Sequence, residues 1–408
     1  MSYNFNNLID RTNTNSLKYD FALERGKPTD ILPLWVADMD FQAPTEILDE
    51  IHKAVSHGIF GYSDVKQDYF NVVHDWFYRH FNWDTKENWL IKTPGVVYAI
   101  AMAVRALTEE GDGVLIQQPV YYPFQETIRL NNRKLVVNSL VYQDGKYSID
   151  FDDFERKIIS ENVKLFILCN PHNPVGRVWS ESELTRLGNI CIEHNVIIVS
   201  DEIHCDFTYP GFLHTVFAGI NDTFAENTIT CTAPSKTFNL AGLQVSNIFI
   251  KNEVIRQKIK AEISKSGYCQ LNTLGLVASK AAYQYGEPWL NELKAYLYDN
   301  LNFVRDFLKE RLPMIKLVEP QGTYLIWLDF SQLNYSKKEM EDLIVNKAKL
   351  WLDPGHIFGK DGEGFERINI ACPREILKKA FEQLENAINE MMIFNNKTQT
   401  NMLNFIQK

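Results

Sequence analysis

Residues 164–176 read KLFILCNPHNPVG, an apolar run that ends in a turn rich in Asn and Pro. Residues 196–204, VIIVSDEIH, and residues 228–236, TITCTAPSK, follow the same plan, because a strand-like run leads directly to polar residues. Short runs of this kind indicate strands that are buried on both faces. The polar clusters then follow the carboxyl ends of the strands, where open α/β sheets bind ligands.

Further runs of this kind alternate with helical patterns between about residues 90 and 250. This alternation predicts an α/β fold with a mainly parallel sheet. We expect strands at Gly113–Gln117, Leu135–Val137, Lys164–Cys169, Val196–Ser200, Thr228–Cys231 and Asn247–Ile250, and helices at Val96–Leu107 and Glu181–Glu193.

The pattern changes after Pro288, where leucines recur at steps of three or four and predict one long amphipathic helix that Pro313 closes. Beyond it we expect a strand at Thr323–Leu328, a helix near Lys337–Ala348, a Gly-rich loop and a last helix from Pro373 to about Met391. We therefore predict a large domain (46–287), a smaller α+β domain (288–394), an N-terminal segment (1–45) packed with the smaller domain, and a mobile polar tail (395–408).

The composition excludes several classes of function. The 408 residues are 45% hydrophobic and carry a net charge of −10, with no long basic run, which argues against nonspecific nucleic-acid binding. There is no signal-peptide pattern at the N-terminus and no run of about 18 apolar residues, so we expect neither secretion nor membrane insertion. The six cysteines show no CxxC pair, which favours buried, reduced thiols in a cytoplasmic protein over metal ligands.

Four segments carry the candidate chemistry, namely Asn170–Gly176, Asp201–His204, Ser235–Asn239 and Arg367–Ala371. Each has a purely structural alternative. Asn-Pro pairs close tight loops, an Asp after a strand often caps a helix, and a loop lysine is usually only solvated. Their order along the chain is far more specific than any one of them.

This ordered set resembles the fold-type I enzymes that use pyridoxal 5′-phosphate (PLP), in the aminotransferase class I and II group, over about Leu32–Met391. Leu34–Phe41, Asp201–His204 and Ser235–Gln244 resemble more narrowly the MalY/PatB branch, which is typified by cystathionine β-lyases, also called C–S lyases. The resemblance implies a three-layer α/β sandwich, PLP as the cofactor and an amino acid as the substrate.

The resemblance also implies roles for the residues around the cofactor ring. Lys236 would attach the cofactor, and its freed amine would act as the general base at the substrate Cα. Asp201 would keep the pyridine nitrogen protonated, so that the ring accepts electrons. Asn173 and His204 would face the ring 3′-oxygen, and Tyr121 would stack on the ring. A histidine that only satisfies its own loop is the alternative for His204, and core packing is the alternative for Tyr121.

The phosphate needs several donors. Gly95, Val96 and Val97 open a predicted helix, whose first N–H groups can bind the anion. Ser235 adds a hydroxyl, and Tyr62 matches a family tyrosine that reaches the phosphate across a dimer interface, which implies a homodimer. Two positions depart from many aminotransferases, since Gln244 stands where those have arginine and Ala233 where they have serine or threonine. The departure favours the lyase branch.

The substrate carboxylate is expected to bind Arg367 through a bidentate pair, with a backbone donor from Ala37. Arg374 is expected to flank the last helix instead. Asp353–His356 with Phe358 and Gly359 would line the mouth of the site.

The resemblance favours an α,β-elimination that yields pyruvate, ammonia and a thiol. An aminotransferase on the same site is the nearest alternative. A regulatory protein that binds a transcription factor is an alternative from another class.

Overall fold

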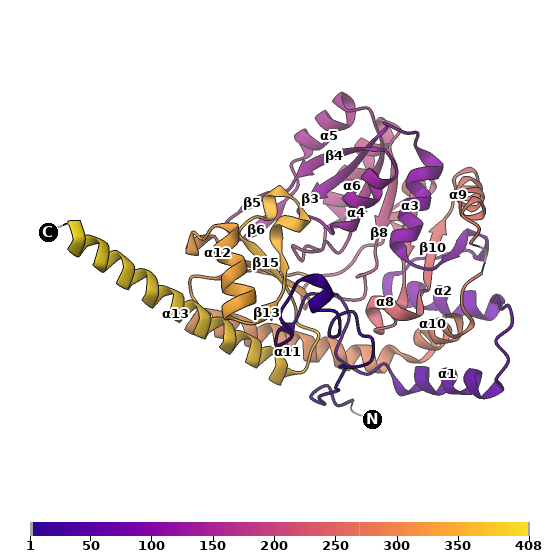
Figure 1. Cartoon of the computed structure of the whole chain (residues 1–408). Helices are drawn as coiled ribbons and strands as arrows, with labels where there is room; N and C mark the ends of the chain where they lie inside the picture. The colour runs from indigo at the N-terminus through magenta and orange to yellow at the C-terminus, as the bar shows by residue number, and fades with distance from the viewer. Residues whose placement is uncertain (1–2, 269, 407–408) are drawn as a thin grey trace.

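A seven-stranded sheet forms the centre of the computed structural model, which describes residues 3–268 and 270–406 (Figure 1). The strand order is β2-β10-β9-β8-β7-β3-β4, and only β10 runs antiparallel to its neighbours. The predicted α/β fold with a mainly parallel sheet is therefore confirmed. The bounds are β2 Leu90–Thr93, β3 Gly113–Gln118, β4 Lys134–Ser139, β7 Val163–Cys169, β8 Ile197–Asp201, β9 Thr228–Thr232 and β10 Ser246–Ile250.

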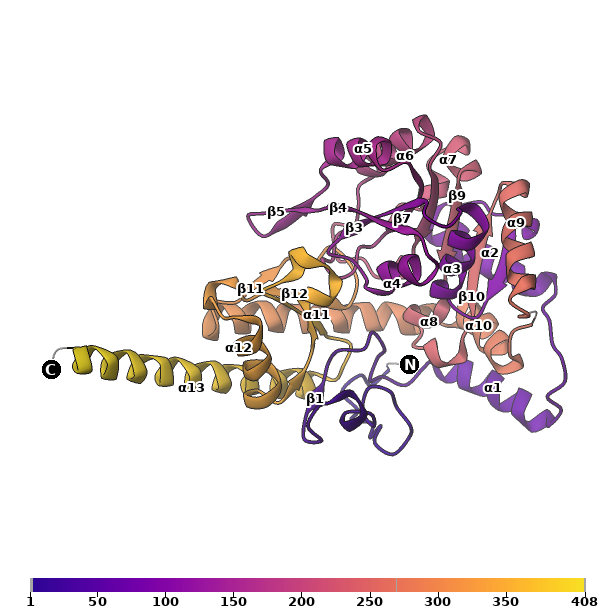
Figure 2. The same ribbon diagram turned by 45° about the horizontal axis from the view of Figure 1, so that its top comes forward.

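Helices cover both faces of this sheet, which makes three layers (Figures 1 and 2). In β7, Phe166 and Leu168 belong to the core shared with α5 and α6, whereas Leu165 and Ile167 belong to the core shared with α3, α4 and α9. Successive strand residues point to opposite faces, so the unbroken apolar run fills both cores. The helices are α1 Thr45–His57, α2 Gln67–Phe81, α3 Val96–Leu107, α4 Pro123–Leu130, α5 Phe151–Ser160, α6 Glu181–Glu193, α7 Asp222–Glu226, α8 Pro234–Thr237, α9 Glu253–Lys265 and α10 Thr273–Tyr285.

A second, antiparallel sheet of four strands lies beyond the long helix α11 (Glu287–Arg311), in the order β11-β12-β15-β14. Its strands are β11 Lys316–Val318, β12 Leu325–Asp329, β14 Asp353–Pro354 and β15 Phe365–Asn369. The remaining elements are the hairpin of β5 Val141–Gln143 and β6 Lys146–Ser148, then α12 Lys337–Glu341, the π-helical segment η6 Asp342–Lys347, β13 Leu350–Trp351 and α13 Arg374–Ile406.

The N-terminal segment contacts the C-terminal part of the chain. Strand β1 (Leu32–Pro33) pairs in parallel with β13, and the rings of Trp35 and Trp351 stack with centroids 4.5 Å apart. The Asn369 N–H then donates to the Leu34 carbonyl at 2.9 Å. These contacts support our division into domains, which stays a proposal.

Two predicted element bounds were wrong. The last helix does not end near Met391 but continues to Ile406, because no Pro or Gly interrupts residues 374–406. The mobility of the tail stays a prediction. The helix expected near Lys337–Ala348 is α-helical only to Glu341 and then widens into η6. Within residues 3–268 and 270–406, no helix has the length and apolar character needed to cross a membrane.

Candidate functional site

A cavity of about 160 Å³ lies at the carboxyl ends of the central strands. Many of the residues singled out in the sequence line it, although they come from six separate stretches of the chain. The lining includes Ala37, Gly95, Val96, Val97, Tyr121, Asn173, Asp201, His204, Ser235 and Lys236, together with Pro94, Cys169, Ile203, Ala241, Gln244 and Val245.

Lys236 lies in α8, a single turn that follows β9 and has Pro234 at its first position, where a missing N–H costs nothing. Its Nζ donates to the Ala37 carbonyl at 2.7 Å. Burial lowers the pKa of this amine to about 8, against the opposing charge of Asp38. An amine with this pKa gains and loses its proton readily near neutral pH.

Asp201 is the last residue of β8, and its carboxylate accepts the Ile203 N–H at 3.1 Å. Burial raises the pKa of this carboxyl to about 7, although the Ile203 N–H and the charge of Lys236 act in the opposite direction. Asp201 has no ion-pair partner among the described residues, and such a buried carboxylate favours a cationic group beside it, because that group recovers the lost solvation.

The turn after β7 and the arginine of β15 meet at Asn173. The Arg367 Nη1 donates to the Asn173 Oδ1 at 2.9 Å, and its Nη2 donates to the Trp35 carbonyl at 2.9 Å and pairs with Asp353. The Phe358 ring lies 4.8 Å below the guanidinium carbon. Arg367 is therefore fixed in place beside the cavity, although it does not line it.

Gly176 closes the same turn with a left-handed φ of 71°. A Cβ at this position would lie 2.8 Å from Pro320, so a larger residue would displace the loop before β12. The Gly176 carbonyl also accepts the N–H groups of Gln321 and Gly322. The final glycine of the Asn-Pro motif thus docks the turn onto the smaller sheet.

His204 and Tyr121 line the cavity from two different loops. His204 is 3% exposed, and its Nδ1 has no hydrogen-bond partner among the described residues. Burial lowers the pKa of this imidazole well below its ordinary value, so the ring is neutral. The Tyr121 N–H donates to the Asn173 carbonyl at 3.0 Å, which ties the loop of Tyr121 to the Asn-Pro turn.

The N-terminus of α3 supplies an anion-binding position. Gly95 is its N-cap, and an added Cβ at Gly95 would meet no atom within 4 Å, so the helix start opens into free space. Val96, Val97 and Ser235 line the cavity beside it. The first N–H groups of a 12-residue helix form a suitable site for a phosphate.

Tyr62 is not part of this cavity. Its side chain is 97% exposed, and it lines a separate groove that shares only Gln244 with the first cavity among the described residues. Within one chain, the position of Tyr62 gives it no contact with the candidate site.

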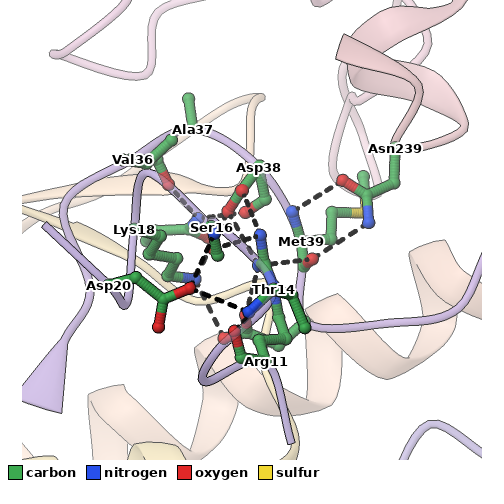
Figure 3. A network of polar contacts seen from close by, with 12 residues as sticks. Arg11, Thr14, Ser16, Lys18, Asp20, Val36, Ala37, Asp38, Met39 and Asn239 are labelled. Carbon is green, nitrogen blue, oxygen red and sulfur yellow. Dashed lines mark hydrogen bonds and ion pairs between the residues drawn. The ribbon is translucent and has the colours of Figure 1, made fainter. Parts of the chain in front are cut away.

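A polar clamp holds the loop that carries Ala37 (Figure 3). Arg11 pairs with Asp38 at 2.6 Å and Asp40 at 2.7 Å, and Lys18 pairs with Asp40 at 2.9 Å. On the other side of the loop, Asn239 accepts the Met39 N–H at 2.9 Å and donates to the Met39 carbonyl. The clamp therefore links the N-terminal segment to the helix turn of Lys236.

We expect Lys18→Met to lower the free energy of unfolding by about 3 kcal/mol, because the side chains of Lys18 and Asp40 are 0% and 5% exposed and the substitution leaves buried carboxylates with less positive charge. Urea unfolding measures this. Lys53→Met, which removes an exposed pair, is the control and should change little. Adding Asp40→Asn to Lys18→Met should recover part of the loss, and purely additive effects would contradict the coupling.

Sequence reasoning missed several groups that shape the site. Tyr324 donates its hydroxyl to the Ala37 carbonyl at 3.1 Å, so this carbonyl accepts two bonds, and the role of Ala37 as a backbone donor stays a prediction. Asp353 was placed at the mouth but pairs with Arg367. The Asn369 side-chain amide donates to the carbonyls of Val36 and Asp38 in the Ala37 loop. In the sequence, only the Arg-x-Asn spacing pointed to Asn369.

Comparisons with known proteins agree with this geometry. Residues 29–384 match the family described as aminotransferase class I and II. The chain is 44% identical to cystathionine beta-lyase PatB of Bacillus subtilis, over 94% of this chain and 100% of PatB, and 32% identical to protein MalY of Escherichia coli, over 95% and 99%. The structure of cystalysin from Treponema denticola, which contains pyridoxal 5′-phosphate, superposes with a TM-score of 0.93 at 39% identity, covering 96% of this chain and 100% of cystalysin. This chain belongs to the aminotransferase class I and II family, in the branch that holds PatB and MalY.

Proposed function

We propose that the protein is a PLP-dependent C–S lyase that acts on a sulfur amino acid of the cystathionine or cystine type. The observation that carries the proposal is the presence of a partly buried lysine, Lys236, and a buried carboxylate, Asp201, in one cavity at the ends of the central strands. The name of PatB, a cystathionine beta-lyase, supports the same assignment, and so does the structure of cystalysin with its cofactor.

The residues present fit PLP. His204 lines the cavity, and its Nδ1 has no hydrogen-bond partner among the described residues, which suits a hydrogen-bonding group of a ligand. Asp201 suits a pyridinium nitrogen, and the open N-terminus of α3 with Ser235 suits a phosphate. When bound, PLP supplies an electron sink for the charge left on the substrate Cα.

The chain's own residues supply attachment, proton transfer and orientation. Lys236 Nζ would hold the cofactor, and its free amine would take the proton from the substrate Cα. Asp201 keeps the ring nitrogen protonated through its negative charge. Arg367, held in place by Phe358 and Asp353, would bind the substrate carboxylate, while Asn173, His204 and Tyr121, which line the cavity, would hold the cofactor ring.

Pyruvate formation tests the proposal. Purified enzyme is incubated with cystathionine or cystine without any keto acid, and pyruvate and free thiol are measured. Stoichiometric amounts of both support the lyase. A requirement for 2-oxoglutarate would instead identify an aminotransferase, since only that reaction needs an acceptor for the amino group.

The cofactor-free enzyme should capture PLP at a rate that depends on pH. Only the neutral amine of Lys236 can bond to an aldehyde, and its pKa is lowered to about 8. The rate should rise about tenfold per pH unit below pH 8 and level off above it. Stopped-flow absorbance measures this, with Nα-acetyl-lysine as the reference. A rise that continues toward pH 10, as in the reference, would contradict the lowered pKa.

We also propose a homodimer in the cytoplasm. Tyr62 has a role in phosphate binding only if it reaches the site of a partner subunit, and its full exposure in one chain supports this arrangement. The five cysteines among the described residues are buried and form no disulfide, which suits a reducing compartment. Light scattering that shows a fully active monomer would contradict the dimer.

A further inference from the structure

A second cavity, of about 350 Å³, lies in the smaller domain between the α12–η6 helix and strands β14 and β15. Figure 1 shows α12 beside β15. Among the described residues, none lines both this cavity and the Lys236 cavity. One wall includes residues of η6, and π-helical turns occur frequently at functional sites.

Glu366 is the feature that distinguishes this cavity. It is 5% exposed, and its carboxylate has no hydrogen bond and no ion pair among the residues that the structure describes. Burial, then the charge of Asp353, raises the pKa of this carboxyl to about 8, and Lys27 and Glu341 also act on it. Glu366 itself lines the cavity, together with Lys27 and Glu341.

The other charges of the cavity leave Glu366 uncompensated. Lys27 lies 3.6 Å from Glu341, with which it forms an ion pair. Glu363 and Lys337 are exposed at the rim, and burial lowers the pKa of His356, which keeps it largely neutral at neutral pH. Three carboxylates against two lysines leave one negative charge when all are ionised. Part of the wall is apolar and consists of Met340, Ile344, Val345, Leu352 and Phe365.

We propose that this cavity is a second, non-catalytic binding site for a primary ammonium group on a short apolar chain, with the ammonium on Glu366. A free amino acid with an apolar side chain and an alkylamine both present this chemistry. A charged donor placed on a buried, unpaired carboxylate recovers its lost solvation, while the apolar chain covers the wall. This site goes beyond the proposed function, and its existence does not depend on it.

The position of Glu366 connects the site to the substrate arginine. In the ladder of β14 and β15, Pro354 pairs with Glu366, and the next pair is Asp353 with Arg367. Adjacent strand residues point to opposite faces, so one face of this ladder carries the Arg367–Asp353 pair and the other carries Glu366. A ligand on Glu366 therefore acts on the strands that hold Arg367.

Titration calorimetry on the Lys236→Ala variant, prepared free of PLP, tests the proposal, because without the cofactor's aldehyde an added amine cannot form a Schiff base in the catalytic cavity. L-leucine and isoamylamine are titrated separately at pH 8.5. We expect one site per chain, with binding weakened at least about tenfold in Lys236→Ala/Glu366→Gln. Adding Glu363→Gln instead, at an exposed rim position, is the matched control and should change the affinity little.

The outcomes separate the alternatives. Binding of both probes supports a site that recognises the ammonium group alone. If leucine binds and isoamylamine does not, the site also recognises the leucine carboxylate, through the lysines at the rim. No heat with either probe, or equal affinity in the Glu366→Gln variant, overturns the proposal. Thermal unfolding of Glu366→Gln should show no loss of stability, because the substitution removes a buried charge without a partner.

The pH dependence gives a second readout. The carboxyl of Glu366, on which the charges of Asp353, Lys27 and Glu341 act, must ionise to bind an ammonium group. Affinity should therefore rise between pH 7 and pH 8.5, with proton release on binding. Equal heats at pH 7 in buffers of different ionisation enthalpy would contradict this. An effect of leucine on the KM for cystathionine, which rests on the proposed function, would show that the site is regulatory.

Discussion

Replacing Lys236 with alanine is expected to reduce pyruvate formation from cystathionine by at least about 10⁴-fold, because the substitution removes both the attachment of the cofactor and the base at the substrate Cα. The purified variant should also lose the visible absorbance of covalently held PLP. The stability should change little, since Lys236 makes a single hydrogen bond, to Ala37, within the part of the chain that the structure describes.

Lys251→Ala is the matched control for this prediction. Lys251 also follows a strand of the central sheet, but it pairs with Asp222 and Glu226 near the surface. It should keep full activity and colour. A Lys236→Ala protein that still forms pyruvate at a tenth of the normal rate would place the base elsewhere and refute the assignment.

Asp201→Asn is expected to lower kcat by about 10³-fold, because a neutral amide cannot keep the ring nitrogen protonated. The amide oxygen can still accept the Ile203 N–H, so the local backbone should be preserved. The burial that raises the pKa of Asp201 to about 7 also indicates that a neutral side chain is well tolerated here. Steady-state kinetics at saturating PLP measures the loss.

Glu202→Gln provides the control, one residue further along the chain. Glu202 is buried too, but its carboxylate holds His214 at 2.7 Å and the Phe217 N–H at 3.0 Å, away from the cavity. This variant should lower the melting temperature and leave kcat within a few-fold of the wild type. If the two variants lost the same activity, general disturbance of β8 would explain both, and no special role would remain for Asp201.

The strands and the main polar clusters were predictable because both follow from local sequence. A buried parallel strand has to be apolar on both faces, so β7 and β8 were apparent from short runs. The clusters of Asn173, Asp201 and Lys236 follow strands directly, and the ends of parallel strands meet at one edge.

The clamp and the second cavity were not predictable, because they depend on long-range packing. Lys18 stands among polar residues near the N-terminus and has no local pattern that marks it as buried. Glu366 adjoins Arg367 in a strand, where a charged residue normally indicates a solvent-facing position. The partner of Lys18, and the lack of a partner for Glu366 among the described residues, both depend on residues that lie elsewhere along the chain.

The loop of Ala37 also has a consequence for the order in which the protein is made. The Met39–Asn239 bonds span 200 residues, and the Asn369 bond to Val36 spans 333. During synthesis, the first-made residues must therefore wait for nearly the last ones to leave the ribosome. A nascent chain that stops before β15 contains Lys236 but lacks Asn369, which is the second anchor of the Ala37 loop. The ability to retain the cofactor should therefore arise only at the end of translation.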